Sequence, residues 1–281
     1  MSIRFTKMHG CGNDYIYINC FNQNINDPEK LAIEMSERHF SVGSDGLVLI
    51  MPSNVADARM RMFNADGSEG NMCGNAIRCI GKYLYDNQIV SKDVVKVETL
   101  SGIKTLHLCI GDDGKVSSVT VNMGQASFKP EDIGLSDDTE YINKKTTVKN
   151  KEYEITAVSM GNPHCVTYVD NVKILNLLKD GPFFENNPLF KNRVNTEFVK
   201  VISKNHLEMR VWERGSGETY ACGTGACAIC AASVKNGICD FNTEINVDLL
   251  GGTLKIKVLD DYTVMMTGPA KIVYEGVYYE D

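Results

Sequence analysis

The sequence predicts an α+β fold in two pseudo-symmetric domains, each a mostly antiparallel sheet wrapped around one central helix. Three observations predict this fold. The chain of 281 residues repeats itself at an offset of 149 residues. Each half carries several short segments of alternating polar and apolar residues, which are typical of half-buried strands. Each half also carries one longer run with helical spacing, and that run begins directly after a Cys-Gly pair.

The repeat is clearest around the two Cys-Gly pairs. Residues 59–74 align with residues 208–223 without a gap, and five of the 16 aligned positions are identical. Composition alone would give about one identity in such a window. The same offset places Gly12-Asn13 on Gly161-Asn162. We therefore expect a first domain of residues 1–122 plus 268–281 and a second domain of residues 123–267, with the crossing in the Gly-rich and polar stretch 124–138.

In the first half, strands are expected before the long helix and again after it. Asp27-Pro28 supplies an N-cap and an N1 proline for a short helix that should end near His39. The expected strands are Val48–Met51, Met60–Phe63, Val94–Glu98, Thr105–Ile110 and Ser118–Asn122.

The two long helices should each bury one apolar face. The helix after Cys73 should stop near Asn87, and the helix after Cys222 should stop at Asn236-Gly237. The residues expected to face inward are Ala76, Ile77, Ile80 and Leu84 in the first helix and Ala226, Ile229 and Ala232 in the second.

Composition excludes several classes of partner. A net charge of −7 argues against nucleic acid and against an anionic membrane surface. The lysine-rich segment 144–151 is interpreted as a solvated linker. The N-terminal residues contain no apolar run typical of a signal peptide, and no stretch approaches the roughly 20 apolar residues that span a bilayer. We therefore expect a cytoplasmic protein whose ten cysteines are reduced thiols.

Cysteine spacing does not favour a metal site. Cys227 and Cys230 form a CxxC pair inside an Ala-rich helical run, with no second ligand pair nearby. No metal and no organic cofactor is expected. Most of the other thiols should be small buried hydrophobic side chains, namely Cys20, Cys79, Cys109 and Cys239.

The two repeat-related cysteines are the candidates for chemistry. Cys73 and Cys222 each stand where a loop turns into a helix, next to backbone N–H groups at the positive end of the helix dipole. Such a position lowers the pKa of a thiol from about 8.5 toward neutrality. A single Cys-Gly pair could be a matter of packing alone, but two pairs in register favour a functional role.

Two thiols facing each other about a pseudo-twofold axis would suit inversion of a stereocentre. One thiolate would remove an α-proton while the opposite thiol supplies another. The two helix N-termini would suit an α-carboxylate. From the residues alone, the hypothesis is a two-thiol amino-acid epimerase.

The sequence also resembles a known family. The segments MHGCGNDY, MFNADGSEGNMCGNAIRC, MGNPHCV and RVWERGSGETYACGTGACA are similar to the signature blocks of the diaminopimelate epimerases, in family order along the whole chain. The resemblance implies interconversion of LL- and meso-2,6-diaminopimelate in lysine and peptidoglycan biosynthesis. It also implies catalysis without a metal or an organic cofactor.

Carried over by motif, the resemblance implies a set of site residues. Cys73 and Cys222 would be the catalytic pair, with His164 and Glu213 helping to set their protonation. Arg214 would grip the distal carboxylate as a fork. The residues implied to hold substrate are Asn13, Asn64, Gly74, Asn75, Asn162, Asn195, Glu213, Arg214, Gly223 and Thr224. Gly46 stands where many members have Gln, so no side-chain contact is expected there.

Several alternatives stay open at this point. Singly, His164 could be a structural histidine, Asn13 and Asn162 could serve only their turns, and Glu213-Arg214 could be a surface pair. A proline racemase or hydroxyproline epimerase would use the same two-thiol logic. A phenazine-type isomerase, a thiol redox protein and a non-catalytic binder are further alternatives. A homodimer is also open.

Overall fold

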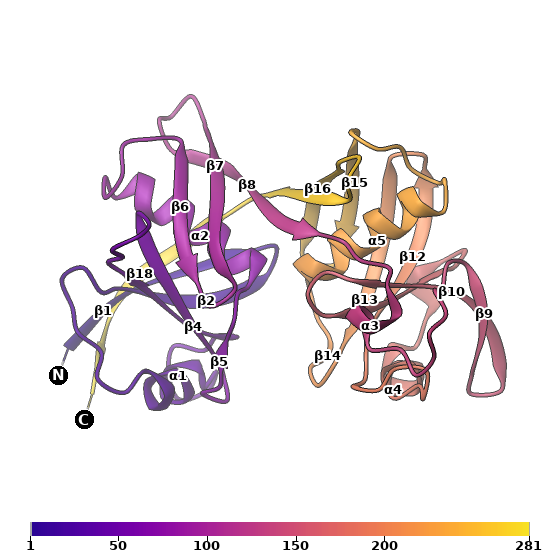
Figure 1. Cartoon of the computed structure of the whole chain (residues 1–281). Helices are drawn as coiled ribbons and strands as arrows, with labels where there is room; N and C mark the ends of the chain where they lie inside the picture. Colours follow the sequence, from indigo (N-terminus) through magenta and orange to yellow (C-terminus); the bar gives the residue numbers. More distant parts are fainter. Residues whose placement is uncertain (1, 281) are drawn as a thin grey trace. The chain divides into compact units, whose positions relative to one another are not determined.

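A computed structural model of the chain describes residues 2–280 (Figure 1). Met1 and Asp281, the outermost residues of the predicted first domain, lie outside the described residues. The chain divides into two compact units, residues 1–121 with 267–281 and residues 122–266, here called the first and the second unit. Both are α+β, and in each the strands surround one 13-residue helix, so the predicted fold class is confirmed.

The first unit contains most of the N-terminal half and the last strand. Its elements are β1 (Ser2–Gly10), β2 (Asn13–Asn19), α1 (Pro28–Ser36), β3 (Gly46–Met51), β4 (Ala58–Asn64), β5 (Glu69–Gly70), α2 (Gly74–Asp86), β6 (Val94–Thr99), β7 (Gly102–Ile110), β8 (Val116–Gln125), which runs on into the second unit, and β18 (Lys271–Tyr279).

The second unit repeats this order with additions before its first parallel pair. Its elements are α3 (Pro130–Ile133), β9 (Lys144–Val148), β10 (Lys151–Ser159), β11 (Pro163–Tyr168), η1 (Val172–Ile174), α4 (Leu177–Glu185), β12 (Asn195–Ser203), β13 (His206–Glu213), β14 (Gly217–Glu218), α5 (Gly223–Lys235), β15 (Glu244–Leu249), β16 (Gly252–Val258) and β17 (Thr263–Gly268), which ends in the first unit.

Strand register reproduces the repeat found in the sequence. β2 and β3 are parallel and pair Tyr15 with Gly46, while β11 and β12 are parallel and pair His164 with Asn195. Both partners differ by the same 149 residues. Each parallel pair continues into an antiparallel hairpin, β3–β4 in the first unit and β12–β13 in the second. The two halves are therefore copies in strand pairing as well as in sequence.

Local sequence accounts for the helices. The Asp27 side chain accepts a hydrogen bond from the Lys30 N–H and caps α1, which ends three residues before the predicted His39. The C-cap residues of α2 and α5 are Asn87 and Asn236, so both helices stop where predicted. All the residues predicted to face inward are fully buried, namely Ala76, Ile77, Ile80, Leu84, Ala226, Ile229 and Ala232.

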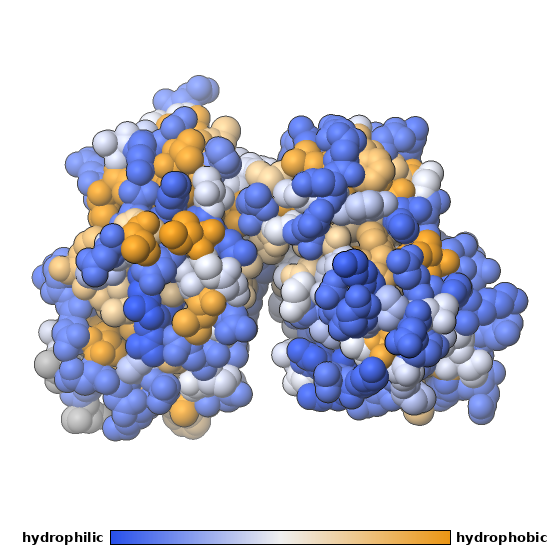
Figure 2. All heavy atoms as spheres, in the orientation of Figure 1, coloured by the Kyte–Doolittle hydropathy of each residue, from blue (hydrophilic) through white to orange (hydrophobic). Residues whose placement is uncertain are grey.

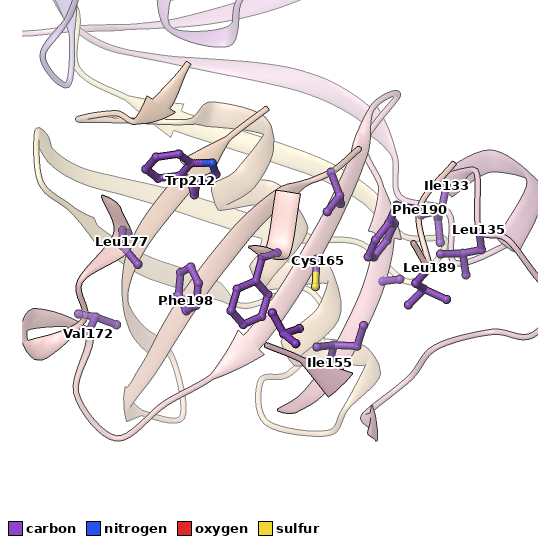
Figure 3. Close-up of a cluster of buried hydrophobic side chains, with 14 residues drawn as sticks. Ile133, Leu135, Ile155, Cys165, Val172, Leu177, Leu189, Phe190, Phe198 and Trp212 are labelled. Carbon is purple, nitrogen blue, oxygen red and sulfur yellow. The ribbon is translucent and has the colours of Figure 1, made fainter. Parts of the chain in front are cut away.

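A cluster of aromatic and aliphatic side chains forms a core in the second unit (Figure 3). At its centre, the Phe184 ring makes edge-to-face contacts with Tyr153 and Phe198, with centroids 4.9 and 5.0 Å apart. Trp212 joins the same cluster and donates from its indole N–H to Glu185 Oε2 over 2.7 Å. Trp212, near the end of β13 that leads toward the Cys222 loop, is therefore held by this core.

Two predictions about linkers are wrong. The stretch 124–138 is not a simple crossing, because Ile133 and Leu135 are buried in the core of the second unit. The lysine-rich segment forms the β9–β10 hairpin. There the Lys149 ammonium lies 4.6 Å from the centre of the Phe183 ring, and this cation–π contact stabilises the turn between the two strands.

The prediction for the remaining thiols is partly wrong. Cys79 and Cys239 are buried, but Cys20 is half-buried and Cys109 is exposed. Alternation along β7 explains the last case, because Leu106 and Leu108 point inward and the residues between and after them point outward. The displayed faces of both units are mostly hydrophilic with scattered apolar side chains (Figure 2). Within residues 2–280, no helix is long and apolar enough to cross a membrane.

Candidate functional site

Cys73 and Cys222 occupy the same structural position in the two units. Each is the N-cap residue of its helix and has extended backbone, with φ −128° and ψ 122° at Cys73 and φ −110° and ψ 109° at Cys222. The carbonyl oxygen of Cys73 accepts from the Ile77 N–H, and that of Cys222 accepts from the Ala226 N–H. Gly74 and Gly223 are the first helical residues. The predicted placement at two helix N-termini is confirmed.

Two of the predicted asparagines surround Cys73. The thiol donates to Asn13 Oδ1 over 3.4 Å, and Asn75 Nδ2 donates to the same oxygen over 3.4 Å. Asn13 lies at the start of β2 and Asn75 in the first turn of α2. The Tyr15 hydroxyl is also hydrogen-bonded to Cys73. The side chains of Asn13 and Tyr15, which are hydrogen-bonded to the Cys73 sulfur, are both neutral polar groups.

Cys222 lies in a more enclosed and more acidic place. Its sulfur accepts from the Gly225 N–H over 3.3 Å and lies 3.5 Å from Thr224 Oγ1. The thiol is also hydrogen-bonded to Glu213, whose side chain accepts a hydrogen bond from the Thr219 hydroxyl. The structure therefore brings Glu213 and Thr224 to the second thiol.

The expected lowering of the thiol pKa is wrong for Cys222. Burial raises the pKa of this thiol well above its usual range, and the carboxylates of Glu213 and Glu197 raise it further. Hydrogen bonds from Thr224 and the Gly225 N–H act in the opposite direction but are outweighed. Cys222 is thus held as a thiol near neutral pH, which is the form that gives up a proton to a carbanion.

Glu213→Gln is expected to lower the pH at which Cys222 becomes reactive by about one unit, because a nearby negative charge that opposes the thiolate is removed. The measurement is the rate of Cys222 alkylation by iodoacetamide against pH, resolved by peptide mass spectrometry. Glu218→Gln is the matched control, since Glu218 is a carboxylate of the same unit paired with Arg210. An unchanged Cys222 profile in Glu213→Gln would contradict the assignment of Glu213 as a charge that acts on the thiol.

His164 is paired with a residue that the sequence analysis did not select. Its Nδ1 lies 2.7 Å from Glu197 Oε1, and both side chains are fully buried. The other carboxylate oxygen of Glu197 has no hydrogen-bond partner among residues 2–280. The sequence does contain a signal for Glu197, because it stands between Thr196 and the apolar Phe198 in an expected inner strand. A charged residue in such a strand needs a buried partner.

The remaining predicted residues fall into two groups. Asn162 Oδ1 lies 3.1 Å from His164 Nε2, and Asn195 Oδ1 accepts from the Arg214 backbone N–H over 2.9 Å, so these residues form two pairs in the second unit. The Arg214 side chain is exposed and donates to the Asn192 carbonyl. Asn64 belongs to the first unit, at the end of β4, where it donates to Ser68.

The repeat makes the two half-sites chemically unequal. At the offset of 149 residues, His164 corresponds to Tyr15, Glu197 to Val48 and Glu213 to Asn64. Ionisable groups of the second unit, fully buried at His164 and Glu197 and half-buried at Glu213, therefore stand where the first unit has Tyr, Val and Asn side chains.

The chain is similar to proteins of known family. The family model described as diaminopimelate epimerase matches residues 5–129 and 156–273. A diaminopimelate epimerase of Acetivibrio thermocellus is 55% identical over 276 residues, covering 98% of each chain. One of Methanococcus maripaludis is 51% identical over 276 residues, covering 98% of this chain and 99% of that relative.

Solved structures share the fold at low sequence identity. A phenazine biosynthesis protein of Bacillus anthracis matches with a TM-score of 0.74 at 16% identity, covering both chains completely. A hydroxyproline epimerase of Agrobacterium vitis matches with a TM-score of 0.72 at 14% identity, covering 98% of this chain and 92% of that one.

Proposed function

This chain belongs to the diaminopimelate epimerase family, and we propose that it interconverts LL- and meso-2,6-diaminopimelate by using Cys73 and Cys222 as its acid–base pair. The observation that carries the proposal is the N-cap cysteine in both repeats. A stereocentre is inverted when one group takes a proton from one face and a different group returns a proton to the other. A fold built from two copies supplies one such group from each copy.

The unequal half-sites support an order of events. Cys222 is held as a thiol by burial and by two carboxylates, whereas the side chains of Asn13 and Tyr15 that hydrogen-bond Cys73 are neutral. We therefore assign removal of the proton from the LL isomer to the Cys73 thiolate and return of a proton to Cys222. The sulfur of Cys73 takes the α-proton, the electron pair stays on the α-carbon and its carboxylate, and the Cys222 S–H bond breaks as the new C–H bond forms.

The backbone at the two helix starts suits the reacting carboxylate. As the α-proton leaves, negative charge develops on that carboxylate, and N–H groups at a helix N-terminus stabilise it. We assign this role to the helix starts, to which Gly74, Asn75, Gly223 and Thr224 belong.

Binding of the non-reacting end is assigned to polar residues of both units. The exposed Arg214 guanidinium can take the distal carboxylate in a bidentate manner, and the amide of Asn195 next to it adds a further polar contact. Asn13, Asn64 and Asn162 complete the proposed set, and binding there would position the α-carbon at the thiols. Glu213 and His164 are assigned to the protonation of Cys222.

The experiment that tests the proposal is exchange in D₂O. With LL-diaminopimelate, we expect the meso product to carry deuterium at the inverted carbon while recovered LL isomer stays unlabelled at early times, because the acid and the base are different groups. L-Proline and trans-4-hydroxy-L-proline are run in parallel. Absence of deuterium from diaminopimelate would sink the proposal, and exchange into either proline would favour the alternative epimerase.

We also propose that the protein is a homodimer through β18. This strand of the first unit exposes the large apolar side chains of Ile272, Val273, Tyr274, Val277 and Tyr279, and protein interfaces cover side chains of this kind. Sedimentation velocity should give twice the mass of one chain, and a single-chain mass at micromolar concentration would refute a stable dimer.

A further inference from the structure

A chain of hydrogen bonds with one direction runs beside Cys73 in the first unit. Arg78 Nη2 donates to Asn75 Oδ1 over 2.9 Å, and Asn75 Nδ2 donates to Asn13 Oδ1 over 3.4 Å. Asn13 Nδ2 then donates to Asp45 Oδ2 over 2.8 Å. A guanidinium thus stands at one end of two amides and a carboxylate stands at the other.

The charged ends leave the two amides one favourable orientation. A guanidinium can only donate and a carboxylate can only accept. If the Asn13 amide turned over, its oxygen would face the Asp45 carboxylate and its NH2 group would face the NH2 group of Asn75. Both contacts would be repulsive, so the observed orientation follows from the identity of the end groups.

The orientation of the Asn13 amide determines whether its oxygen or its NH2 group faces the Cys73 sulfur. Asn13 Oδ1 lies 3.4 Å from the Cys73 sulfur and accepts the thiol proton. We propose that Asp45 is a positioning residue, which acts through Asn13 to keep a carbonyl oxygen on the Cys73 sulfur and so favours the thiol form of that residue. The proposal rests on the proposed function only in its role for catalysis: stabilising the thiol makes the Cys73 thiolate a stronger base toward the α-proton.

Further contacts fix the two ends of this hydrogen-bond chain. At one end, the Arg78 side chain is fully buried, and its Nη1 also donates to the Gly74 carbonyl over 3.0 Å. Gly10 leaves room for Arg78, since a Cβ at position 10 would lie 2.9 Å from Arg78 Nη2. At the other end, Arg38 Nη2 donates to Asp45 Oδ1 over 2.8 Å.

The second unit does not contain this arrangement. At the repeat offset, Arg78 corresponds to Cys227 and Asp45 corresponds to Val194. The counterpart of Asn13 is Asn162, whose Oδ1 faces His164 Nε2 instead of the cysteine. The positioning by Asp45 therefore belongs to the Cys73 half-site alone.

Three titratable groups that are electrostatically coupled to Cys73 stay neutral near neutral pH. Burial raises the pKa of Tyr15 and of Tyr17 well above their usual range, and it raises the pKa of Cys79 to about 11. Burial also raises the pKa of Cys11, whose thiol is hydrogen-bonded to Arg78. Charged side chains of this region include Asp45 with its partner Arg38, Asp14 with Lys7, and Arg78.

The experiment is the pH profile of Cys73 alkylation in Asp45→Asn. An asparagine at 45 can donate as well as accept, which removes one of the two repulsive contacts that oppose turning of the Asn13 amide, so that amide can present its NH2 group to the sulfur. We expect the alkylation midpoint of Cys73 to fall by about one pH unit, the size of one neutral hydrogen bond. The reagent is iodoacetamide, with peptide-resolved mass spectrometry on the full chain.

Two controls separate positioning from simple loss of charge. Asp14→Asn removes a carboxylate that also binds Arg38 but whose side chain does not accept from Asn13, and it should leave the Cys73 midpoint within a few tenths of a unit. In an Asn13→Ala background, Asp45→Asn should cause no further shift. An equal shift in that background, or no shift in Asp45→Asn itself, would overturn the proposal. Because alkylation does not require catalytic turnover, a result that contradicts the role of Asp45 would not contradict the proposed epimerase reaction.

Discussion

Cys73→Ala and Cys222→Ala are each expected to slow epimerisation of LL-diaminopimelate by about a thousandfold or more, because each removes one of the two groups that move a proton. Asn13 and Asn75 near Cys73 cannot exchange protons with carbon near neutral pH, and burial raises the pKa of Tyr15 well above its usual range. Glu213 is hydrogen-bonded to Cys222 but stands on a different element, β13. The measurement is the initial rate of meso isomer formation, followed by chiral separation.

Cys230→Ala is the matched control for these two variants. Cys230 is a fully buried thiol of α5, two turns beyond Cys222, so the same substitution tests the effect of losing a small core side chain. Cys230→Ala should turn over at a rate close to that of the parent protein. If either Cys73→Ala or Cys222→Ala kept the parent rate, the two-base scheme would be wrong.

His164→Leu is expected to lower the free energy of unfolding by about 3–5 kcal/mol, because it leaves the Glu197 carboxylate buried without its partner. Glu197 is fully buried, its Oε1 is held only 2.7 Å from His164, and its second oxygen has no hydrogen-bond partner within residues 2–280. The measurement is urea unfolding followed by far-UV circular dichroism.

A double variant separates this effect from a general packing defect. His164→Leu with Glu197→Leu removes both polar groups together, and it should be clearly more stable than His164→Leu alone, because an apolar pair needs no buried counter-ion. Glu197→Gln, which keeps the shape and removes the charge, should cost less than His164→Leu. Equal losses in the single and the double variant would show that the pair carries no uncompensated charge.

Much of the fold could be predicted because its signals are local. The internal repeat predicted two copies of one unit, and the strand register repeats at the same offset. Caps and periodicity predicted where the helices begin and end, since these depend on a few neighbouring residues. Predictions failed where packing between distant segments determines the structure. In the stretch 124–138, for example, the apolar residues Ile133 and Leu135 are buried in the core of the second unit.

The candidate site was predicted in part. Residues that share a motif with the cysteines were selected, and the structure brings Asn13 and Asn75 to Cys73 and brings Glu213 and Thr224 to Cys222. Glu197 was missed because it lies 25 residues before Cys222 in the sequence and reaches the site only through the pairing of β11 with β12. No local pattern reports such a contact.

By itself, the sequence determined that two cysteines stand at equivalent helix starts, because a repeat and a helix boundary are both written in neighbouring residues. Only the tertiary structure decided what surrounds each sulfur. At Cys222, burial and two carboxylates from β12 and β13 outweigh the helix N-terminus and raise the thiol pKa. At Cys73, one amide oriented by Asp45 faces the sulfur. The partial positive charge at a helix N-terminus lowers a thiol pKa by a similar amount at any helix start. Desolvation and nearby charges, in contrast, depend on which strands the fold packs against the thiol.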